Sequence, residues 1–269
     1  MREAATVMLV RDDPELHVFM MRKSPTVVFT PGAYVFPGGA VDVADGDPRV
    51  YERILGIDDS RASALIDVPG DGLRYWVAAA RESFEEAGLV LGSGAESLAP
   101  RREELNAGTL SWNSALDEHD VVLDLGHVHV FAHWLTPEGA PRRYDTWFFL
   151  AAAPDDQEGA HDDNELVHSE WVRPVDALER CRAREIELIF PTLRSLIAIA
   201  RYSRTEDLLA AVATAQTTTP LTVIDDSSGQ RIRLPGDERE GHLGWRSLVP
   251  ALDLDIAAER AFFEGEGAA

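Results

Sequence analysis

The sequence predicts a mixed α/β fold in which a sheet is sandwiched by helices. Three observations lead to this prediction. Strand-like segments precede a strongly amphipathic segment near residues 73–89, more strand-like segments follow it, and further helical segments come late in the chain. A chain of 269 residues, 45% of them hydrophobic, can bury one sizeable core with an appendage, or two small domains.

The first elements are predicted to be two strands joined by a turn. From Ala5 to Met21, apolar runs are interrupted by charged residues and an Asp-Pro turn, a pattern unlike that of a signal peptide. The next segment, SPTVVFTPGAYVFPGGAVD, mixes β-branched and aromatic residues with proline and glycine and predicts a turn-rich connection. Residues 46–72 then predict an insertion with two short helices, in PRVYERILG and SRASALI.

The segment LRYWVAAARESFEEAGL predicts the central helix. On a wheel at about 100° per residue its apolar side chains fall on one half, and Gly88 provides a natural C-terminal stop. The apolar half consists of Leu73, Trp76, Val77, Ala80, Phe84 and Ala87. We therefore expect this half to face the core.

The elements after the central helix alternate again between strand and helix. We expect an exposed stretch through PRREELNAG, followed by two central strands in HVHVFAHWLTP and DTWFFLAAAP. An acidic loop, DDQEGAHDDNEL, leads to a short strand and a helix in HSEWVRPVDAL. After Glu185, ELIFPTLRSLIAIARYS and TEDLLAAVATA predict helices, and TPLTVIDDSSGQRIRLPGDE predicts a hairpin.

The composition argues against several classes of partner. A formal charge of −22 and a pI near 4.6 leave no basic face for broad adhesion to nucleic acid or to an anionic membrane. No uninterrupted apolar run approaches the roughly 18 to 20 residues that span a bilayer. The single Cys181 cannot form an internal disulfide, which is compatible with a reducing compartment, and we expect the protein in the cytoplasm.

Three glutamates gather on the side of the central helix opposite the apolar half. Glu82, Glu85 and Glu86 are three or four residues apart and are therefore neighbours on one surface. Three like charges destabilise a helix unless a cation lies between them, and carboxylate oxygens suit hard ions such as Mg²⁺ or Mn²⁺. Arg81 can pair with Glu85 and leave the other two freer for metal. Taken alone, however, the helix favours the alternative of a solvated face with one ion pair.

A resemblance to a known motif favours the metal site over the solvated face. PGGAVDVAD followed by ARESFEEAGL resembles the Nudix box, G-x(5)-E-x(7)-R-E-U-x-E-E-x-G-U, in which U is an aliphatic residue. The matching positions are Gly39, Arg81, Glu82, Glu85, Glu86, Gly88 and Leu89. Three features differ: Asp45 stands at the place of the first glutamate, Ser83 replaces an aliphatic residue, and residues 46–80 replace the seven-residue spacer.

The interruption of the box is similar to that in the Nudix branch that includes the peroxisomal coenzyme A diphosphatase. FTPGAYVFPGG, RESFEEAG, LTPEGAPRRYDTWFFLA, SEWVRPVDAL and LIFPTL follow one another in the order expected for that branch. The resemblance implies the Nudix fold, an α/β/α sandwich with a mixed sheet, in residues 1–200. We expect residues 201–269 to form an extension of helix and hairpin packed on the same domain.

The resemblance also implies a reaction, in which water attacks a phosphorus of a nucleoside diphosphate linked to another moiety. Mg²⁺ or Mn²⁺ would neutralise the diphosphate and activate the water. The implied ligands are Glu82, Glu85, Glu86 and the carbonyl of Gly39, where a glycine lets the backbone approach the ion. Glu85 and Arg81 are therefore also placed among the catalytic residues.

Many members of the family take an additional carboxylate, as ligand or base, from a loop just before a Glu-Trp pair. Glu165 lies five residues ahead of Glu170 and Trp171, in the acidic loop, and is our candidate for this role. The competitors are Asp162, Asp163 and Glu170 itself, and a merely solvated loop is the alternative.

Basic residues are few enough in this chain to be considered as phosphate ligands. Arg22 and Lys23 end the second strand, and Arg142 and Arg143 precede the DTWFFLA strand. We take Arg22 and Arg143 as substrate-binding candidates, with ordinary surface charge as the alternative for each. His127 and His129 share one side of a strand, but packing is favoured over a transition-metal site because no third Cys or His has a suitable spacing.

The leading hypothesis is thus a Nudix-type diphosphatase acting on coenzyme A or acyl-coenzyme A, giving 3′,5′-ADP and a 4′-phosphopantetheine fragment. ADP-ribose, NADH and nucleotide sugars remain alternative substrates because one fold hosts many reactions. A rival of another class is a catalytically silent Nudix-like module that binds a nucleotide, and a third is an acidic scaffold that binds no Mn²⁺. A homodimer is left open.

Overall fold

A mixed sheet of eight strands forms the centre of the structure, a computed structural model that describes residues 1–27, 30–136, 142–162 and 165–214 and the backbone of three later strands. The strand order is β12-β7-β8-β1-β2-β3, with β4 beside β1 and β9 beside β2. Strand β1 runs parallel to β8 and antiparallel to β2 and β4, so the sheet is mixed, as predicted. The strands are β1 (Arg2–Asp12), β2 (Leu16–Lys23), β3 (Tyr34–Val35), β4 (Gly38–Ala40), β7 (His129–Leu135), β8 (Tyr144–Ala152), β9 (Leu166–Val172) and β12 (Trp245–Ser247).

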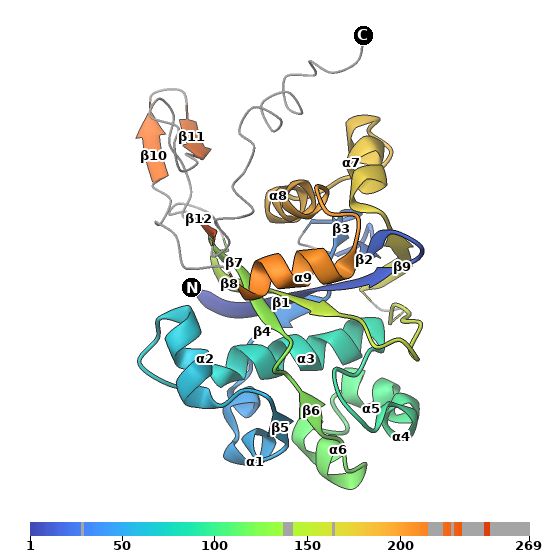
Figure 1. The fold of residues 1–269 in the computed structure, drawn as a ribbon, viewed down its shortest axis with the longest axis vertical. Coiled ribbons are helices and arrows are strands. Elements are labelled where there is room, and N and C mark those ends of the chain that lie inside the picture. The colour runs from blue at the N-terminus through green and yellow to red at the C-terminus, as the bar shows by residue number, and fades with distance from the viewer. Residues whose placement is uncertain are drawn as a thin grey trace.

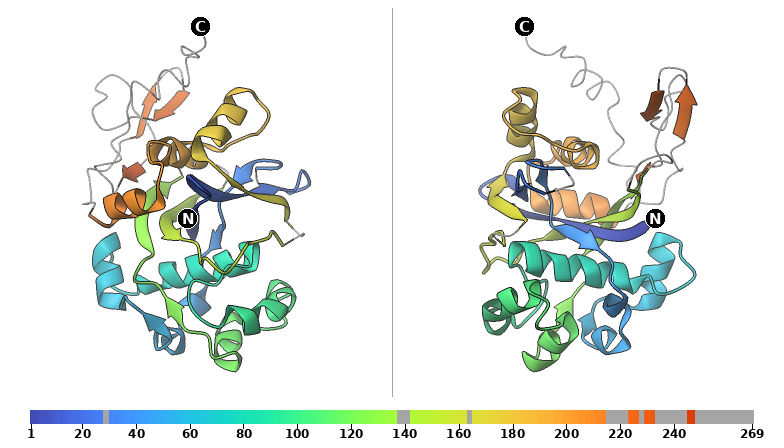
Figure 2. Two further views of the ribbon diagram at one scale, coloured as in Figure 1. Left: turned by 45° about the vertical axis from the view of Figure 1, so that its right-hand side comes forward. Right: turned by 180° about the vertical axis from the view of Figure 1, so that it is seen from behind.

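Helices cover both faces of this sheet (Figures 1 and 2). The central helix α3 (Leu73–Ala87) lies on one face, and α7 (Pro174–Arg182), α8 (Phe190–Ile199) and α9 (Thr205–Ala213) lie on the other. The strands are apolar on both sides because each side meets a helical layer: Val7 of β1 belongs to the core under α3, whereas its neighbour Met8 belongs to the core under α8 and α9. The predicted α/β/α sandwich is confirmed.

The insertion that follows Asp45 contains two short helices, as predicted. Its elements are η1 (Val43–Gly46), α1 (Pro48–Tyr51), β5 (Ile54–Leu55) and α2 (Asp59–Ile66). The insertion closes on the beginning of α3, where Asp59 Oδ1 accepts a hydrogen bond of 3.0 Å from the backbone N–H of Leu73. Its two ends meet, since a side-chain carbon added to Gly46 would lie 3.3 Å from an oxygen of Asp71.

The segment between α3 and the second half of the sheet differs from the expected exposed stretch. It forms four short helices: α4 (Ala95–Leu98), η2 (Ala99–Arg101), α5 (Arg102–Asn106) and α6 (Trp112–Glu118). Leu98, Leu105 and Leu116 are buried, and the ring of Trp112 lies 6.0 Å from that of Phe84 on α3. These few apolar contacts with α3 organise a segment whose composition is otherwise polar. Strand β6 (Leu123–Asp124) then pairs with β5 of the insertion.

The C-terminal part contains the expected helix α9 and a hairpin formed by β10 (Val223–Asp226) and β11 (Gly229–Ile232). Leu208 and Val212 of α9 belong to the same core as α8. Strand β12 was not predicted, and it pairs through its backbone with β7. The division of the chain at residue 200 stays a prediction. None of the described helices is long and apolar enough to cross a membrane.

Candidate active site

Helix α3 presents its glutamates to the glycine-rich strand β4. Register places Gly39 opposite Ala5 of β1, directly above the helix side that carries Glu82. A side-chain carbon added to Gly39 would lie 2.4 Å from an oxygen of Glu82, which is closer than real atoms approach. Glycine is therefore required at position 39 for Glu82 to occupy this position.

The neighbouring Gly38 holds the third glutamate. Its backbone N–H donates a hydrogen bond of 2.8 Å to Oε2 of Glu86. A side-chain carbon at Gly38 would also lie 2.5 Å from the hydroxyl oxygen of Thr6, so strand β4 could not pair with β1 in this register. The two glycines thus bring α3 and the sheet edge close enough for backbone and carboxylates to share one site.

Arg81 is buried at the centre of the acidic group. Its Nη1 donates to Glu82 at 2.7 Å and to Glu85 at 2.8 Å, while Nε donates to Asp45 at 2.9 Å and Nη2 to the carbonyl of Ala40 at 2.8 Å. The expected pair with Glu85 is present. The expectation that Glu82 is left freer is wrong, because one guanidinium nitrogen lies between both carboxylates.

Asp45 proves to be part of this network. The sequence marks it only as a departure from the box, but its side chain is almost completely buried, 1% exposed, against Arg81. Its other oxygen also accepts a hydrogen bond from the backbone N–H of Asp42. Asp45 therefore supplies the carboxylate that orients Arg81, which in turn orients Glu82 and Glu85.

The carboxylates resist ionisation in the absence of a metal ion. Burial raises the pKa of Glu82 to about 7 despite the opposing charge of Arg81, and the charge of Glu85 contributes to the rise. Burial also raises the pKa of Glu85, and the pKa of Glu86 lies well above its ordinary value because of burial and the nearby Glu82. Repulsion between buried like charges is the condition that a bound divalent cation relieves.

This arrangement predicts how the metal-free protein responds to pH. A carboxyl group with a raised folded-state pKa holds its proton when the unfolded chain has lost it, so stability falls as pH rises from about 4.5 through 7. We expect the melting temperature of metal-free protein to fall between pH 5 and pH 8, and Mn²⁺ to raise it more at pH 8 than at pH 6.

Glu86→Gln provides the control for this experiment, because it removes one of the crowded charges and keeps an oxygen for Gly38. The variant should melt at a higher temperature than wild type in metal-free buffer at pH 8 and respond less to Mn²⁺. An identical pH profile for wild type and variant would show that repulsion within this group does not control stability.

A cavity of about 960 Å³ opens beside the glutamates. One wall is α3, and the others are α5 with the residues just before it and the loop before β9. The lining residues are Glu82, Glu85, Glu86, Ala99, Pro100, Arg102, Glu103, Asn106, Ala107, His161, Asp162 and Glu165. Figure 1 shows α5 beside the C-terminal end of α3. Among the described residues, neither the insertion 46–72 nor helices α7, α8 and α9 contribute to this lining.

The structure brings Glu165 to the same cavity as the three α3 glutamates. Its side chain is exposed, and its carbonyl accepts a hydrogen bond of 2.7 Å from the backbone N–H of Ser24. Of its competitors, Asp162 also lines the cavity, whereas Glu170 is engaged elsewhere by Arg180 at 2.8 Å. Asp163 lies outside the described residues.

The two arginines proposed for substrate binding are not brought to this cavity. Arg22 lines a separate hollow of about 630 Å³ beside α7. Arg143 precedes β8, where its Nε donates to the carbonyl of Thr136 at 3.2 Å. The neighbour of Arg22, Lys23, belongs with the acidic group, since its charge opposes the rise in the pKa of Glu86. Alternation along β2 explains this result, because successive side chains point to opposite faces.

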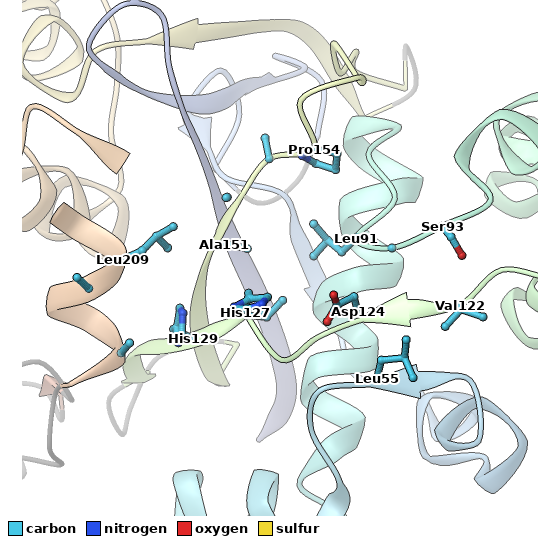
Figure 3. Close-up of a pocket in the computed structure, with 16 residues that line it drawn as sticks. Leu55, Leu91, Ser93, Val122, Asp124, His127, His129, Ala151, Pro154 and Leu209 are labelled. Carbon is cyan, nitrogen blue, oxygen red and sulfur yellow. The ribbon is translucent and has the colours of Figure 1, made fainter. Parts of the chain in front are cut away.

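A second cavity, of about 820 Å³ and with a mostly apolar lining, shares no residue with the acidic one (Figure 3). It lies between α9 and the ends of β7 and β8, and its lining includes His127, His129 and Asp124. Burial lowers the pKa of His129. Both histidines thus line a cavity wall, and the described residues contain no metal-binding group that includes them.

The donor set beside α3 fits Mg²⁺ or Mn²⁺ by its chemistry, because it consists of carboxylate oxygens crowded around a close backbone approach. In the described parts of the chain, no three acidic, His or Cys side chains are already arranged around a metal position. A bound ion would therefore have to draw the glutamates together. The arrangement suits polarisation of an anionic substrate and activation of water.

Fold and site together define a Nudix hydrolase. A crystal structure of a Nudix hydrolase from Alicyclobacillus acidocaldarius superimposes with a TM-score of 0.64 at 25% identity, covering 79% of this chain and 96% of that one. The model of the NUDT19 Nudix domain matches residues 47–199, more than half of the chain, and the chain belongs to this family. The resemblance stated from the sequence is confirmed.

Named relatives support the same assignment. The acyl-coenzyme A diphosphatase NUDT19 of Gallus gallus is 27% identical over an alignment that covers 77% of this chain and 70% of that protein. The protein of the same name in Homo sapiens is 27% identical over an alignment that covers 71% of this chain and 62% of that protein. The alignment thus spans less than two thirds of the human relative.

Proposed function

We propose that this protein hydrolyses a phosphoanhydride bond in a nucleoside diphosphate linked to another moiety, with coenzyme A or acyl-coenzyme A as the leading substrate. The observation that carries the proposal is the convergence of Glu82, Glu85 and Glu86 on one cavity beside Gly39. The names of the chicken and human relatives favour the acyl-coenzyme A class over other dinucleotide-like substrates.

In the proposed mechanism, Glu82, Glu85 and Glu86 would hold Mg²⁺ or Mn²⁺, and the carbonyl of Gly39 would be a further ligand. The chemistry supplied by such an ion would be neutralisation of charge on the diphosphate and a lower pKa for the attacking water. Arg81 keeps Glu82 and Glu85 in position through its contacts with both. A new bond forms between the water oxygen and phosphorus, the bridging P–O bond breaks, and Glu165 at the cavity accepts the proton of the water.

The first experiment is a hydrolysis panel with purified full-length protein. It compares coenzyme A, acetyl-coenzyme A, NADH, ADP-ribose and UDP-glucose, each with Mg²⁺, with Mn²⁺ and with EDTA, and separates the products by chromatography. We expect metal-dependent release of 3′,5′-ADP from the first two compounds. If another compound alone is hydrolysed, that compound is the substrate in place of coenzyme A. If folded protein binds Mn²⁺ but hydrolyses none of the compounds, a silent binding module is favoured.

Glu165→Gln tests the proposed proton acceptor. The variant keeps the size of the side chain and the backbone contact to Ser24, so we expect unchanged folding and a turnover number about 10²-fold lower, at the lower end of the usual range for a general base. The decrease should be larger at low pH than at high pH, where hydroxide replaces the base.

Glu170→Gln is the matched control, because Glu170 carries the same charge on the adjoining strand but is held by Arg180. Its turnover number should remain within about threefold of wild type, since surface polar changes of this kind have small effects. Equal activity of Glu165→Gln and wild type would remove Glu165 from the mechanism.

A further inference from the structure

The wall of the acidic cavity that α5 forms carries a basic residue. Besides the three α3 glutamates, Glu103, Asp162 and Glu165 line the cavity, so a diphosphate entering it meets six carboxylates. Metal ions offset part of this repulsion. Among the described lining residues, Arg102 at the start of α5 is the one with a permanent positive charge.

The guanidinium of Arg102 is held between two walls of the cavity. Its Nε donates to the carbonyl of Glu85 at 3.0 Å, and its Nη1 donates to the carbonyl of His161 at 3.5 Å. Gly88 permits this position, since a side-chain carbon there would lie 3.1 Å from Nη1. Both acceptors are backbone carbonyls, and these two contacts fix the orientation of the guanidinium at the cavity.

We propose that Arg102 is a substrate-binding residue that contacts the diphosphate in the cavity that Glu82, Glu85 and Glu86 also line. The inference rests on the proposed function and deepens it. A planar guanidinium presents several N–H donors at fixed angles and matches phosphate oxygens better than an ammonium group does. The contacts with Glu85 and His161 place the charge of Arg102 beside the carboxylates of the proposed metal site. The diphosphate can then be bound by the metal ion and by Arg102 together.

A purely structural role for Arg102 is the alternative, because a cation that donates to the last carbonyls of a helix stabilises that helix. The chain itself offers the control for this alternative. Asn106, one turn later on α5, donates from Nδ2 to the same carbonyl of Glu85 at 3.1 Å and lines the same cavity, but it is neutral. Both residues donate to the carbonyl of Glu85 near the end of α3, but of these two only Arg102 carries a charge.

The test compares wild type, Arg102→Gln, Arg102→Lys and Asn106→Ala in the full chain. Turnover number and KM are measured on the best substrate of the hydrolysis panel, and the Kd of ADP with Mg²⁺ is measured by calorimetry. We expect Arg102→Gln to raise KM and Kd about 10- to 100-fold, the loss typical of a hydrogen bond to a charged group, with little change in turnover number. Arg102→Lys should recover part of the affinity, and Asn106→Ala should lower the affinity less than Arg102→Gln does, because it removes a contact to the same carbonyl but no charge.

Two results would overturn the proposal. One is an unchanged KM and Kd in Arg102→Gln, and the other is an equal loss of affinity in Arg102→Gln and Asn106→Ala accompanied by equal losses of melting temperature, which would assign Arg102 to helix capping. If the wild type hydrolyses nothing, the proposed function fails separately, and the ADP titration of the same variants still decides whether Arg102 binds a diphosphate.

Discussion

Glu85→Gln is expected to lower the turnover number by about 10²- to 10⁴-fold without unfolding the protein, the range found when a charged group in the reaction centre is removed. Glu85 touches Arg81 at 2.8 Å and lines the cavity, as Glu82 does, and its side chain is the more exposed of the two. Glutamine keeps the shape of the side chain and an oxygen for Arg81, but it lacks the negative charge that an ion requires.

The measurement is the turnover number at saturating substrate and metal, with circular dichroism to verify folding. Glu103→Gln removes the same charge from the facing wall of the cavity and should lower turnover less than tenfold. A folded Glu85→Gln variant with the activity of wild type would exclude Glu85 from both metal binding and catalysis, and the assignment of the whole glutamate group would then need revision.

Arg81→Met is expected to destabilise the fold by about 3–5 kcal/mol, the usual cost of removing one partner from a buried ion pair. The arginine is 6% exposed and pairs with Asp45, Glu82 and Glu85 at once. Methionine fills a similar volume but leaves three partly or fully buried carboxylates without their shared cation. Urea unfolding in metal-free buffer at pH 7.5 measures the loss.

A second substitution separates this electrostatic cost from a packing defect. Asp45 is the most buried of the three carboxylates, and Asp45→Asn on the Arg81→Met background removes its charge while keeping its size. We expect the double variant to be more stable than Arg81→Met alone, so that the two changes are not additive. Equal stability of wild type and Arg81→Met would mean that the network contributes nothing to folding.

The sequence was sufficient for the elements whose periodicity is long and regular. Helix α3 ends at Ala87 with Gly88 in the left-handed conformation, as its pattern predicts, and the long strands β1, β2, β7 and β8 occur where apolar runs indicate them. The spacing of the three glutamates placed them on one surface of this helix, and the resemblance to the Nudix box implied their role. These features depend on local spacing, which a single sequence contains.

Other features depend on contacts between distant segments. Both Arg22 and Lys23 end β2, and because the sheet is covered on both faces, alternation alone does not reveal which of them shares a face with α3. Arg102 lies in a polar segment that has no strong helical period and becomes ordered against the end of α3. Asp45 meets Arg81 only because the intervening 35 residues fold back on themselves.

The return of the insertion to its starting point has a consequence for how this family varies. Since Gly46 and Asp71 lie side by side, the segment between them leaves and re-enters the domain at one place. The free-energy cost of closing a loop grows only with the logarithm of its length, so such a segment can lengthen or shorten over generations while Asp45, Arg81 and the glutamates keep their geometry. Changes of length are therefore best accommodated in the exposed turns of residues 46–72, because Val50, Ala62 and Ile66 are buried in the core that includes α3.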